Sequence, residues 1–337
     1  MSQLQTAFFG RATYGTSVVK LPFGLFLKQY PTAELCRNEF ATLQMVRKCS
    51  TIPVPKPLDM IIINPDVAEI VALKPDSYEA PSLGRKDVLS LPGQQSPPPE
   101  QESPLVEIPP FEPQSISLQH EPQLDVIPPF DPSSLPNEPE LHDTAPSQIF
   151  VVMSGLPGSS LDQSIESISD PDLACVCEDL KGCLRQLQTI KNTVNAEFPI
   201  CSTLGEGILD HRLNGSTPSG PFTDEASFNQ LLAYPDDPAF QGHKIVYTHA
   251  DLNPRNILVD RFRQDDGSVR WGISGIIDWE TAGFFPEYWE YTKSRYEAFR
   301  WSKRLADFLE NSIGASGNYT DELEAELRNW QRQIALG

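Results

Sequence analysis

Short apolar runs and longer helical periods follow one another along the chain in a simple order. Four short runs near the N-terminal end are rich in β-branched or aromatic residues and bounded by Pro or Gly, the pattern of strands; they cover 16–21, 23–28, 61–63 and 68–73. Apolar residues spaced by three or four positions predict helices at 32–48, 172–192, 224–232 and 320–334. The order predicts an α+β protein in which a small antiparallel sheet with one helix precedes a mostly helical part.

Polar residues interrupt the apolar pattern most sharply between residues 245 and 290. A short apolar strand, Ile245-Val246, is followed by a polar loop and by a second strand at 257–259. The turn signal Asp266-Gly267 predicts a hairpin whose second arm ends at 276–277. We therefore expect the polar side chains of the loop, and of the residue after the second arm, to gather at one end of a small sheet.

Asp251, Asn256 and Asp278 are the side chains that this arrangement brings together. Phosphoryl transfer from a nucleotide requires positioned partners and neutralised phosphate oxygens more than covalent help from the protein. An Asn oxygen and a carboxylate suit Mg²⁺, and a separate carboxylate can accept the hydrogen bond of an attacking hydroxyl. The spacing His249-x-Asp251-x-x-x-x-Asn256 is also that of the protein-kinase catalytic loop. A single Asp or Asn more often makes a turn, so the assignment depends on both segments occurring in order.

These two segments resemble a known family of enzymes. His-x-Asp-Leu-Asn-Pro-Arg-Asn-Ile-Leu-Val at 249–259 and Ile-Ile-Asp-Trp-Glu-x-Ala-Gly at 276–283 are similar to motifs of the aminoglycoside phosphotransferase and choline kinase superfamily. Together with Pro-Glu-Tyr-Trp-Glu-Tyr at 286–291, the second motif resembles the branch abundant in filamentous fungi. The resemblance implies a two-lobed protein-kinase-like fold. Ala250 stands where the family often has Gly, which is a mild departure.

The resemblance also implies an activity and roles for individual residues. The activity is ATP- and Mg²⁺-dependent transfer of the γ-phosphoryl group to a hydroxyl. Asp251 would be the catalytic base, Asn256 and Asp278 would bind Mg²⁺, and His249 and Arg255 would brace the loop. Family members act mostly on small molecules, so we expect a small-molecule acceptor rather than a protein, and no residue of the sequence identifies it.

Four residues of the N-terminal part are candidates for nucleotide binding. Lys28 ends an apolar strand, as the strand lysine of kinases does, and would hold the α/β-phosphates. Glu39 lies in the middle of the predicted helix and is the natural ion-pair partner of Lys28. Exposed lysines and glutamates are common in general, and it is the downstream motifs that favour this pair. The strand at 148–153 runs into a Gly/Pro turn that resembles the family's hinge, where Met153 and Gly155 would contact adenine through the main chain.

The composition changes completely between residues 75 and 147. This segment holds 17 of the 32 prolines and thirteen acids against two bases, a net charge of −11. Such a composition buries too little apolar area to offset the entropy of ordering, so we expect an insertion that is disordered. Similar Ile-Pro-Pro-Phe-acidic-Pro units at 108–113 and 127–132 could dock a protein that recognises proline motifs through residues 105–132. A tolerated surface insertion without a partner and translated intron sequence are the alternatives.

The sequence is therefore divided into four parts. They are the first part of a small lobe (1–74), the insertion (75–147), the last small-lobe strand with the hinge (148–158) and a large lobe with the catalytic loop (159–337).

Bulk properties restrict the partners and the compartment. The net charge of −20 argues against nucleic acid or an anionic membrane as the main partner. The six cysteines lack paired metal-ligand spacing, which favours free thiols. The first residues have no signal-peptide pattern, and no stretch approaches the ~18 apolar residues of a spanning helix, so we expect a cytoplasmic protein.

A second interpretation is a nucleotide-binding or scaffold protein that keeps the kinase-like fold without turnover. Its support is the weak glycine pattern of Gly10 and Gly15, the short N-terminal segment and the large acidic insertion.

Overall fold

The computed structural model describes residues 17–63, 70–73, 148–210, 212–213, 217–296 and 298–336. The predicted insertion at 75–147, with its proline units, lies outside the described residues, and so do Gly10 and Gly15. The division of the chain into parts at 74, 147 and 158 stays a prediction.

The small lobe is built on one five-stranded antiparallel sheet with the order β1-β2-β5-β3-β4. Its strands are β1 (Ser17–Lys20), β2 (Leu25–Tyr30), β3 (Pro57–Ile63), β4 (Ile70–Leu73) and β5 (Gln148–Ser154). Lys28 lies in the middle of β2, opposite Val18 and Val151, and not at the end of a strand as the sequence suggested. The central place of β5 brings residues on both sides of the predicted insertion into one sheet.

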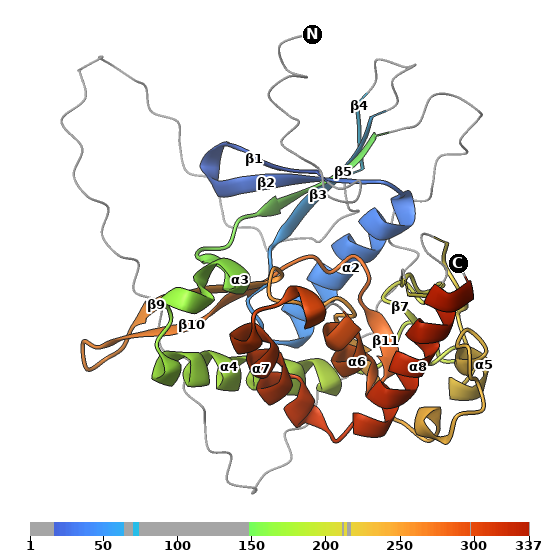
Figure 1. The fold of residues 1–337 in the computed structure, drawn as a ribbon. Helices are drawn as coiled ribbons and strands as arrows, with labels where there is room; N and C mark the ends of the chain where they lie inside the picture. Colours follow the sequence, from blue (N-terminus) through green and yellow to red (C-terminus); the bar gives the residue numbers. More distant parts are fainter. Residues whose placement is uncertain are drawn as a thin grey trace, which may run out of the picture.

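Helix α2 (Ala33–Cys49) covers this sheet on the side that faces the large lobe (Figure 1). The side chain of Thr32 caps its first turn by accepting a hydrogen bond from the N–H of Leu35. Leu43 and Val46 are fully buried, as the helical period predicts. The same helix also buries the polar side chains of Asn38 and Glu39, which need partners at such positions.

The large lobe contains two three-stranded sheets, β10-β9-β6 and β7-β11-β8. The strands are β6 (Ser159–Ser160), β7 (Cys201–Ser202), β8 (Ile245–Thr248), β9 (Ile257–Arg263), β10 (Val269–Ile276) and β11 (Gly283–Pro286). The predicted β9–β10 hairpin is present, with a left-handed φ of 82° at Gly267 in its turn. The strand at Ile245 does not join that hairpin, because β8 pairs with β11 in the other sheet.

Helices pack around these sheets and contain more residues of the lobe than the strands do. They are α3 (Leu161–Ser164), α4 (Asp170–Thr189), α5 (Glu225–Asn229), α6 (Trp289–Tyr296), α7 (Lys303–Ser312) and α8 (Thr320–Leu336). Short 3₁₀ turns are η1 (Pro22–Gly24), η3 (Ile165–Ser167), η4 (Pro238–Phe240), η5 (Ala298–Arg300) and η6 (Gly314–Ser316). The predicted α+β architecture, a small antiparallel lobe followed by a mostly helical large lobe, is confirmed (Figure 1).

Burial of the aromatic and helical side chains differs in part from the sequence pattern. Trp289 is fully buried and stacks with Phe285 at 5.6 Å between ring centroids, whereas Phe299 is exposed. On α8 the prediction of a buried face through Leu323 and Leu327 is wrong for Leu327, which is 42% exposed. The helix is rotated so that Ala325 is buried in its place.

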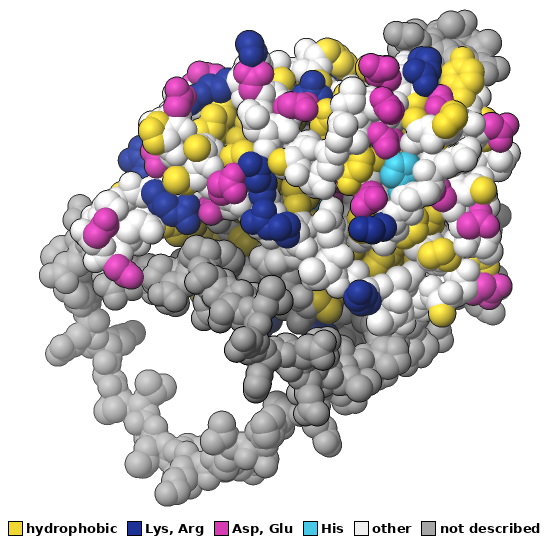
Figure 2. All heavy atoms as spheres, turned by 90° about the horizontal axis from the view of Figure 1, so that it is seen from below, with side chains coloured by type: hydrophobic (Ala, Val, Ile, Leu, Met, Phe, Trp, Pro, Cys, Tyr) yellow, Lys and Arg dark blue, Asp and Glu magenta, His cyan; other side chains and the backbone are white. Residues whose placement is uncertain are grey.

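Three further features of the described residues concern the predicted partners and compartment: surface charge, the hydrophobicity of the helices and the state of the cysteines. On the face seen in Figure 2, basic and acidic side chains are mixed and make no extended patch of one sign. Within the described part of the chain, none of the helices has the length and apolar character that crossing a membrane requires. All six cysteines are free thiols.

Candidate active site

The loop at 249–256, between β8 and β9, is held by the ring of His249. Its Nε2–H donates to the carbonyl oxygen of Ile277 (3.0 Å), and its Nδ1 accepts from the backbone N–H of Asp251 (3.2 Å). The ring is fully buried against Trp279, with 4.4 Å between ring centroids. Burial lowers the pKa of His249 to about 4, so the ring is neutral near pH 7 with its proton on Nε2. His249 therefore joins the loop to the segment after β10.

A second support of the loop is the side chain of Glu290, at the start of α6. One carboxylate oxygen accepts from the N–H groups of His249 (2.7 Å) and Ala250 (3.3 Å), and the other accepts from the N–H of Leu252 (3.3 Å). Ala250 has a left-handed φ of 63°, which turns successive N–H groups toward this carboxylate. Burial raises the pKa of Glu290 to about 7 although the three N–H groups favour its charged form. The sequence analysis gave Glu290 no role, although it quoted the segment 286–291 that contains it.

Two amide side chains are directed at Asp251. Asn253 Nδ2 donates to its carboxylate Oδ2 (3.3 Å), and Asn256 Nδ2 donates to the same oxygen (3.2 Å) and to the backbone carbonyl of Asp251 (2.9 Å). Burial raises the pKa of Asp251 to about 6, while the positive charges of Lys293 and Arg255 act in the opposite direction. The carboxylate is thus oriented by two amide groups and lies close to positive charge.

Asn256 and Asp278 lie at the same end of the β9–β10 hairpin. Ile257 pairs with Ile276. The N–H of Ile277 donates to the carbonyl oxygen of Asn256 (3.0 Å), which extends the pairing of the two strands to Asn256 and Ile277. Asp278 has a left-handed φ of 70°, and its side chain is 38% exposed. The sequence expectation that these two residues lie near Asp251 at one sheet end agrees with this geometry, although β8 belongs to a different sheet.

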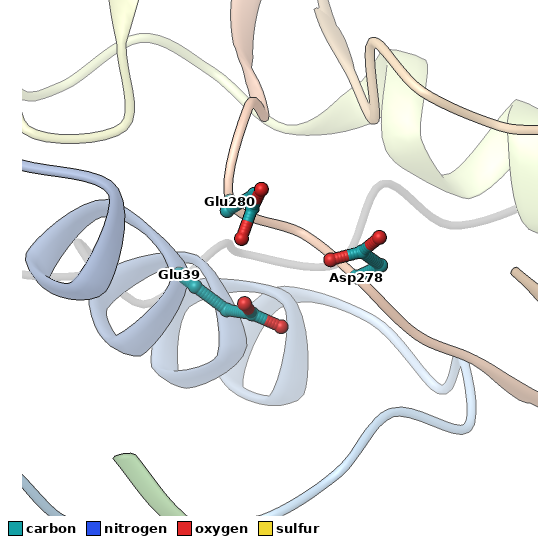
Figure 3. A group of neighbouring side chains, drawn as sticks. All are labelled: Glu39, Asp278 and Glu280. Atoms are coloured by element: carbon teal, nitrogen blue, oxygen red, sulfur yellow. The ribbon is translucent and has the colours of Figure 1, made fainter. Parts of the chain in front are cut away.

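The ammonium group of Lys28 lies among three carboxylates at the junction of the lobes. Its Nζ is 2.5 Å from Glu39 Oε2, 2.5 Å from Asp278 Oδ1 and 2.9 Å from Glu280 Oε2. Figure 3 shows the three carboxylates extending toward one another from α2 and from the loop after β10. Burial disfavours the charged form of Lys28, but the three acids outweigh it and hold its pKa well above the ordinary value. The Lys28–Glu39 pair inferred from the sequence is present, with Glu280 as a further partner.

The same acids differ in their own protonation. Burial raises the pKa of Glu280 to about 7, with repulsion from Asp278 and Glu39 adding to the effect of burial against the attraction of Lys28. The pKa of Asp278 is lowered, because the charge and hydrogen bond of Lys28 exceed the cost of burial. Asp278 therefore stays ionised more firmly than Glu280.

Helix α2 contacts the segment after β10 directly. Glu39 Oε1 accepts from the backbone N–H of Trp279 (3.2 Å). Asn38 Nδ2 donates to the carbonyl oxygens of Glu280 and Ala282, both at 2.9 Å. The small lobe thus holds the backbone that directly follows Asp278.

The donor set at the end of the hairpin fits a hard cation. Both donor contacts of the Asn256 amide are directed at Asp251, so its carbonyl oxygen lies at the other edge of the amide group. Asp278 offers a partly exposed, ionised carboxylate at the same end of the hairpin. Oxygens of Glu39, Asp278 and Glu280 also lie within 4.8 Å of one another, but the ammonium of Lys28 already compensates that group. An amide oxygen with a carboxylate is the kind of set that Mg²⁺ accepts.

Met153 and Gly155 lie at the end of β5, where the small lobe passes into the large lobe. Met153 is buried and pairs with Phe26 of β2. The N–H of Gly155 donates to the carbonyl oxygen of Gly24 (2.7 Å), in the turn between β1 and β2. In this conformation the Gly155 N–H is therefore engaged within the protein, and the expectation of main-chain contacts to adenine remains a prediction.

Arg255 is exposed on the loop at 249–256. Its Nε donates to Asn253 Oδ1 (3.3 Å), and its guanidinium carbon lies 5.2 Å from the ring centroid of Trp301. Arg255 thus contacts the loop and the segment between α6 and α7, and its role in bracing the loop stays a prediction.

A further group of buried charges lies beneath the loop. Asp210 is 3.0 Å from Lys293 Nζ and 3.2 Å from Arg212 Nε, and Arg212 is 3.9 Å from Glu326. Burial disfavours the ionised form of Asp210, but the two cations lower its pKa. None of these four residues was a candidate of the sequence analysis, and no motif indicated them.

Solved structures with a similar shape are aminoglycoside phosphotransferases. The GDP complex of aminoglycoside 2'-phosphotransferase-IIIa has a TM-score of 0.47 and 11% identity, over 94% of this chain and 80% of that chain. The streptomycin–ATP ternary complex of APH(2")-IIa has a TM-score of 0.47 and 10% identity, over 99% and 87%. Neither likeness is close enough to indicate an acceptor.

The sequence comparisons identify a family but no individual relative. No curated protein matches the sequence significantly. The model of the phosphotransferase enzyme family matches residues 126–327, more than half of the chain, including the loop at 249–256 and Asp278. Lys28 and Glu39 lie outside the matched residues. On this match the chain belongs to the phosphotransferase enzyme family.

Proposed function

We propose that the protein is an ATP- and Mg²⁺-dependent kinase that transfers the γ-phosphoryl group to a hydroxyl of a small molecule. The observation that supports this best is the convergence of an oriented carboxylate (Asp251), an amide with a carboxylate (Asn256, Asp278) and a buried cation (Lys28) at the junction of the lobes. Such a set provides positioning and charge neutralisation, which are the main requirements of phosphoryl transfer.

Asp251 is the group that receives the acceptor hydroxyl. The hydroxyl oxygen attacks the γ-phosphorus, the bond from this phosphorus to the β–γ bridging oxygen breaks, and ADP leaves with that electron pair. The hydroxyl proton passes to the carboxylate of Asp251. Asn253 and Asn256 hold this carboxylate by its Oδ2, so that Oδ1 is left to face the hydroxyl.

Lys28, held in place by the two acids beside it, would bind the phosphates. Glu39 fixes the ammonium at 2.5 Å within the small lobe, and Glu280 adds a second anchor at 2.9 Å. With Asp278 as a ligand of a metal ion, these two acids would still hold Lys28 in place for the α/β-phosphates.

Asn256 and Asp278 would hold Mg²⁺, through the amide oxygen and the carboxylate. The ion, when bound, neutralises phosphate charge. The backbone hydrogen bond from Ile277 to Asn256 keeps the two ligands at one end of the hairpin. Main-chain groups at Met153–Gly155 would contact the adenine ring of the nucleotide. The acceptor remains a small molecule of unknown identity, and the cytoplasm remains the predicted compartment.

The decisive test is thermal stability with and without ATP and Mg²⁺. A ligand well above its dissociation constant stabilises the native state by mass action, which raises the melting temperature by several degrees. We expect a Mg²⁺-dependent rise in the wild type, its loss in Asp278→Ala, and its retention in Asp266→Ala. Asp266 is an exposed acid in the turn of the same hairpin and is the matched control. Absence of a rise in the wild type would contradict the proposal.

A second variant separates binding from catalysis. Asp251→Asn keeps the size of the side chain and removes its ability to accept a proton. We expect it to keep the nucleotide-dependent rise in melting temperature and to lose ADP formation, because Asp251 is not a ligand of the metal in this proposal. Loss of both properties would place Asp251 in the binding of nucleotide.

A further inference from the structure

Helix α2 of the small lobe directs one buried amide side chain into the large lobe. Asn38 is 5% exposed, and its Nδ2 donates to the carbonyl oxygens of Glu280 and Ala282, both at 2.9 Å. Its Oδ1 accepts from the backbone N–H of Thr203, directly after β7, at 3.0 Å. All three partners are main-chain groups distant in the sequence. Both donor hydrogens of the amide and its acceptor oxygen thus hold the backbone of the other lobe.

The two carbonyl groups belong to a turn that follows the proposed metal ligand, Asp278. In this turn the N–H of Ala282 donates to the carbonyl oxygen of Trp279 (3.1 Å), and Asp278 just before it has a left-handed φ of 70°. The described residues 277–282 lie between β10 and β11 and belong to neither a helix nor a strand. Main-chain carbonyl groups at such a place need donors from elsewhere. Asn38 donates to two of them and thereby fixes the turn relative to α2.

A cluster of hydroxyl groups lies one helical turn further along α2. Thr42 Oγ1 is 2.7 Å from Thr203 Oγ1, which is 2.7 Å from the hydroxyl of Tyr247 in β8. All three residues are buried. Asn38 and Thr42 are four positions apart and therefore lie on the same face of the helix. This face packs on the large lobe through polar contacts, and the contacts of the Asn38 side chain include the turn at 279–282.

We propose that Asn38 is a positioning residue that holds the turn at 279–282 so that Asp278 is in place for Mg²⁺ before the nucleotide binds. This inference rests on the proposed function, because Asp278 is a metal ligand only there. Asn38 acts through the backbone and touches neither the metal nor the nucleotide. Hydrogen bonds that orient a ligand in this way typically change metal affinity by about 10- to 100-fold.

The chemistry of the side chain explains why an amide stands at this position. Two donors and an acceptor on a side chain of this size are offered by asparagine, whereas aspartate lacks the donors and leucine lacks all three. The same turn carries Glu280, whose carboxylate is 2.9 Å from Lys28 Nζ. Figure 3 shows the loop with Asp278 and Glu280 running beside α2. Asn38 therefore also fixes the backbone of one of the acids that hold Lys28.

The first test is the Mg²⁺ requirement of nucleotide binding. Mg²⁺ is titrated at constant ATP into the full chain, and the concentration that gives half of the rise in melting temperature is recorded. We expect this concentration to increase about tenfold in Asn38→Leu. Asn38→Ala, whose smaller side chain leaves room for water, should show the same direction of change and serves if Asn38→Leu does not fold.

A second measurement needs neither metal nor nucleotide. Amide hydrogen exchange reports how often the turn at 279–282 opens. We expect exchange at the N–H of Ala282 to become about tenfold faster in the Asn38 variants, because the turn loses its two donors.

Thr42→Val is the matched control, since it removes a buried polar contact from the same face of α2 and keeps the shape of the side chain. It should lower the urea midpoint, as the Asn38 variants do, and leave both the Mg²⁺ requirement and the exchange at Ala282 unchanged. An unchanged Mg²⁺ requirement in the Asn38 variants, or an equal increase in Thr42→Val, would overturn the inference. Absence of any Mg²⁺-dependent rise in the wild type would instead contradict the proposed function.

Discussion

The carboxylate of Glu290 accepts a hydrogen bond from the backbone N–H of Ala250, a residue held in a left-handed conformation with φ of 63°. A left-handed conformation costs an alanine roughly 1–2 kcal/mol. The neighbouring N–H groups of His249 and Leu252 donate to the same carboxylate, so three hydrogen bonds to a charged acceptor offset the strain. The shape of the loop that presents Asp251 thus depends on a side chain 39 residues further along the chain.

Replacing Glu290 should therefore loosen the loop. Glu290→Gln keeps one acceptor oxygen and directs an NH₂ group at N–H donors, so we expect a loss of about 1–3 kcal/mol in the free energy of unfolding. ADP formation should fall further than nucleotide affinity, because the loop positions Asp251. Urea denaturation and nucleotide titration measure the two effects. Glu166→Gln, at an exposed position of η3, is the control and should change neither. Wild-type stability and turnover in Glu290→Gln would mean that other contacts hold the loop.

Lys28 should be more costly to remove than any one of its three acids. Lys28→Met leaves Glu39, Asp278 and Glu280 close together without their buried cation, and breaking such a group costs about 3–5 kcal/mol. In that background Glu280→Gln should restore part of the lost stability, because it removes one repelling charge. In the wild type the same change should be neutral or destabilising. A double-mutant cycle by denaturant unfolding checks the sign, and additive effects would refute the electrostatic explanation.

The elements that sequence reasoning located correctly are those defined by local pattern. The hairpin of β9 and β10 follows from its turn residues and apolar arms, and it places Asn256 and Asp278 together without further information. The helix with Glu39 follows from its period, and the strand with Lys28 from its apolar run. These features depend on neighbours in the sequence.

The parts that were missed depend on contacts distant in the sequence. Nothing near Glu290 shows that its carboxylate meets the N–H groups around Ala250, because a hydrogen bond from a side chain to backbone so distant in sequence leaves no local residue pattern. The pairing of β8 with β11 was missed for a similar reason: a four-residue apolar run does not specify its partner. Leu327 was misplaced because tertiary contacts rotate α8 relative to its apolar period.

The pKa of His249 predicts a stability that falls in acid. The folded value, about 4, lies below the ordinary 6.5, so the unfolded chain binds more protons in this range. The contribution of the neutral ring is complete above about pH 6.5 and is lost as the pH falls toward 4, with a slope of at most about 1.4 kcal/mol per pH unit. As the pH falls through this range, we expect the free energy of unfolding to decrease more steeply for the wild type than for His249→Gln. Parallel curves from urea denaturation between these pH values would contradict the assignment.

Glu290 predicts the opposite trend over an overlapping range. Its folded pKa is raised to about 7 from 4.5, so the folded state binds more protons and stability is lost as the pH rises between these values. The wild type should therefore lose stability relative to Glu290→Gln as the pH increases from about 4.5 to 7. Exposed Glu166→Gln again serves as the control, since it should leave the slope unchanged. A difference between wild type and Glu290→Gln that does not vary with pH would mean that the carboxyl group keeps its ordinary pKa in the folded protein.

The buried charges beneath the loop give a last prediction, which concerns Asp210. Asp210→Asn leaves the buried cations Lys293 and Arg212 without their common carboxylate, which should cost about 3–5 kcal/mol of unfolding free energy. Asp236→Asn, at an exposed position, should have no measurable effect. The double variant Asp210→Leu with Lys293→Met removes one charge of each sign and keeps the pair of Arg212 with Glu326, so it should be more stable than Asp210→Asn. If the double variant is instead the less stable, the ion pair itself stabilises the fold, and the loss in Asp210→Asn cannot be assigned to uncompensated charge alone.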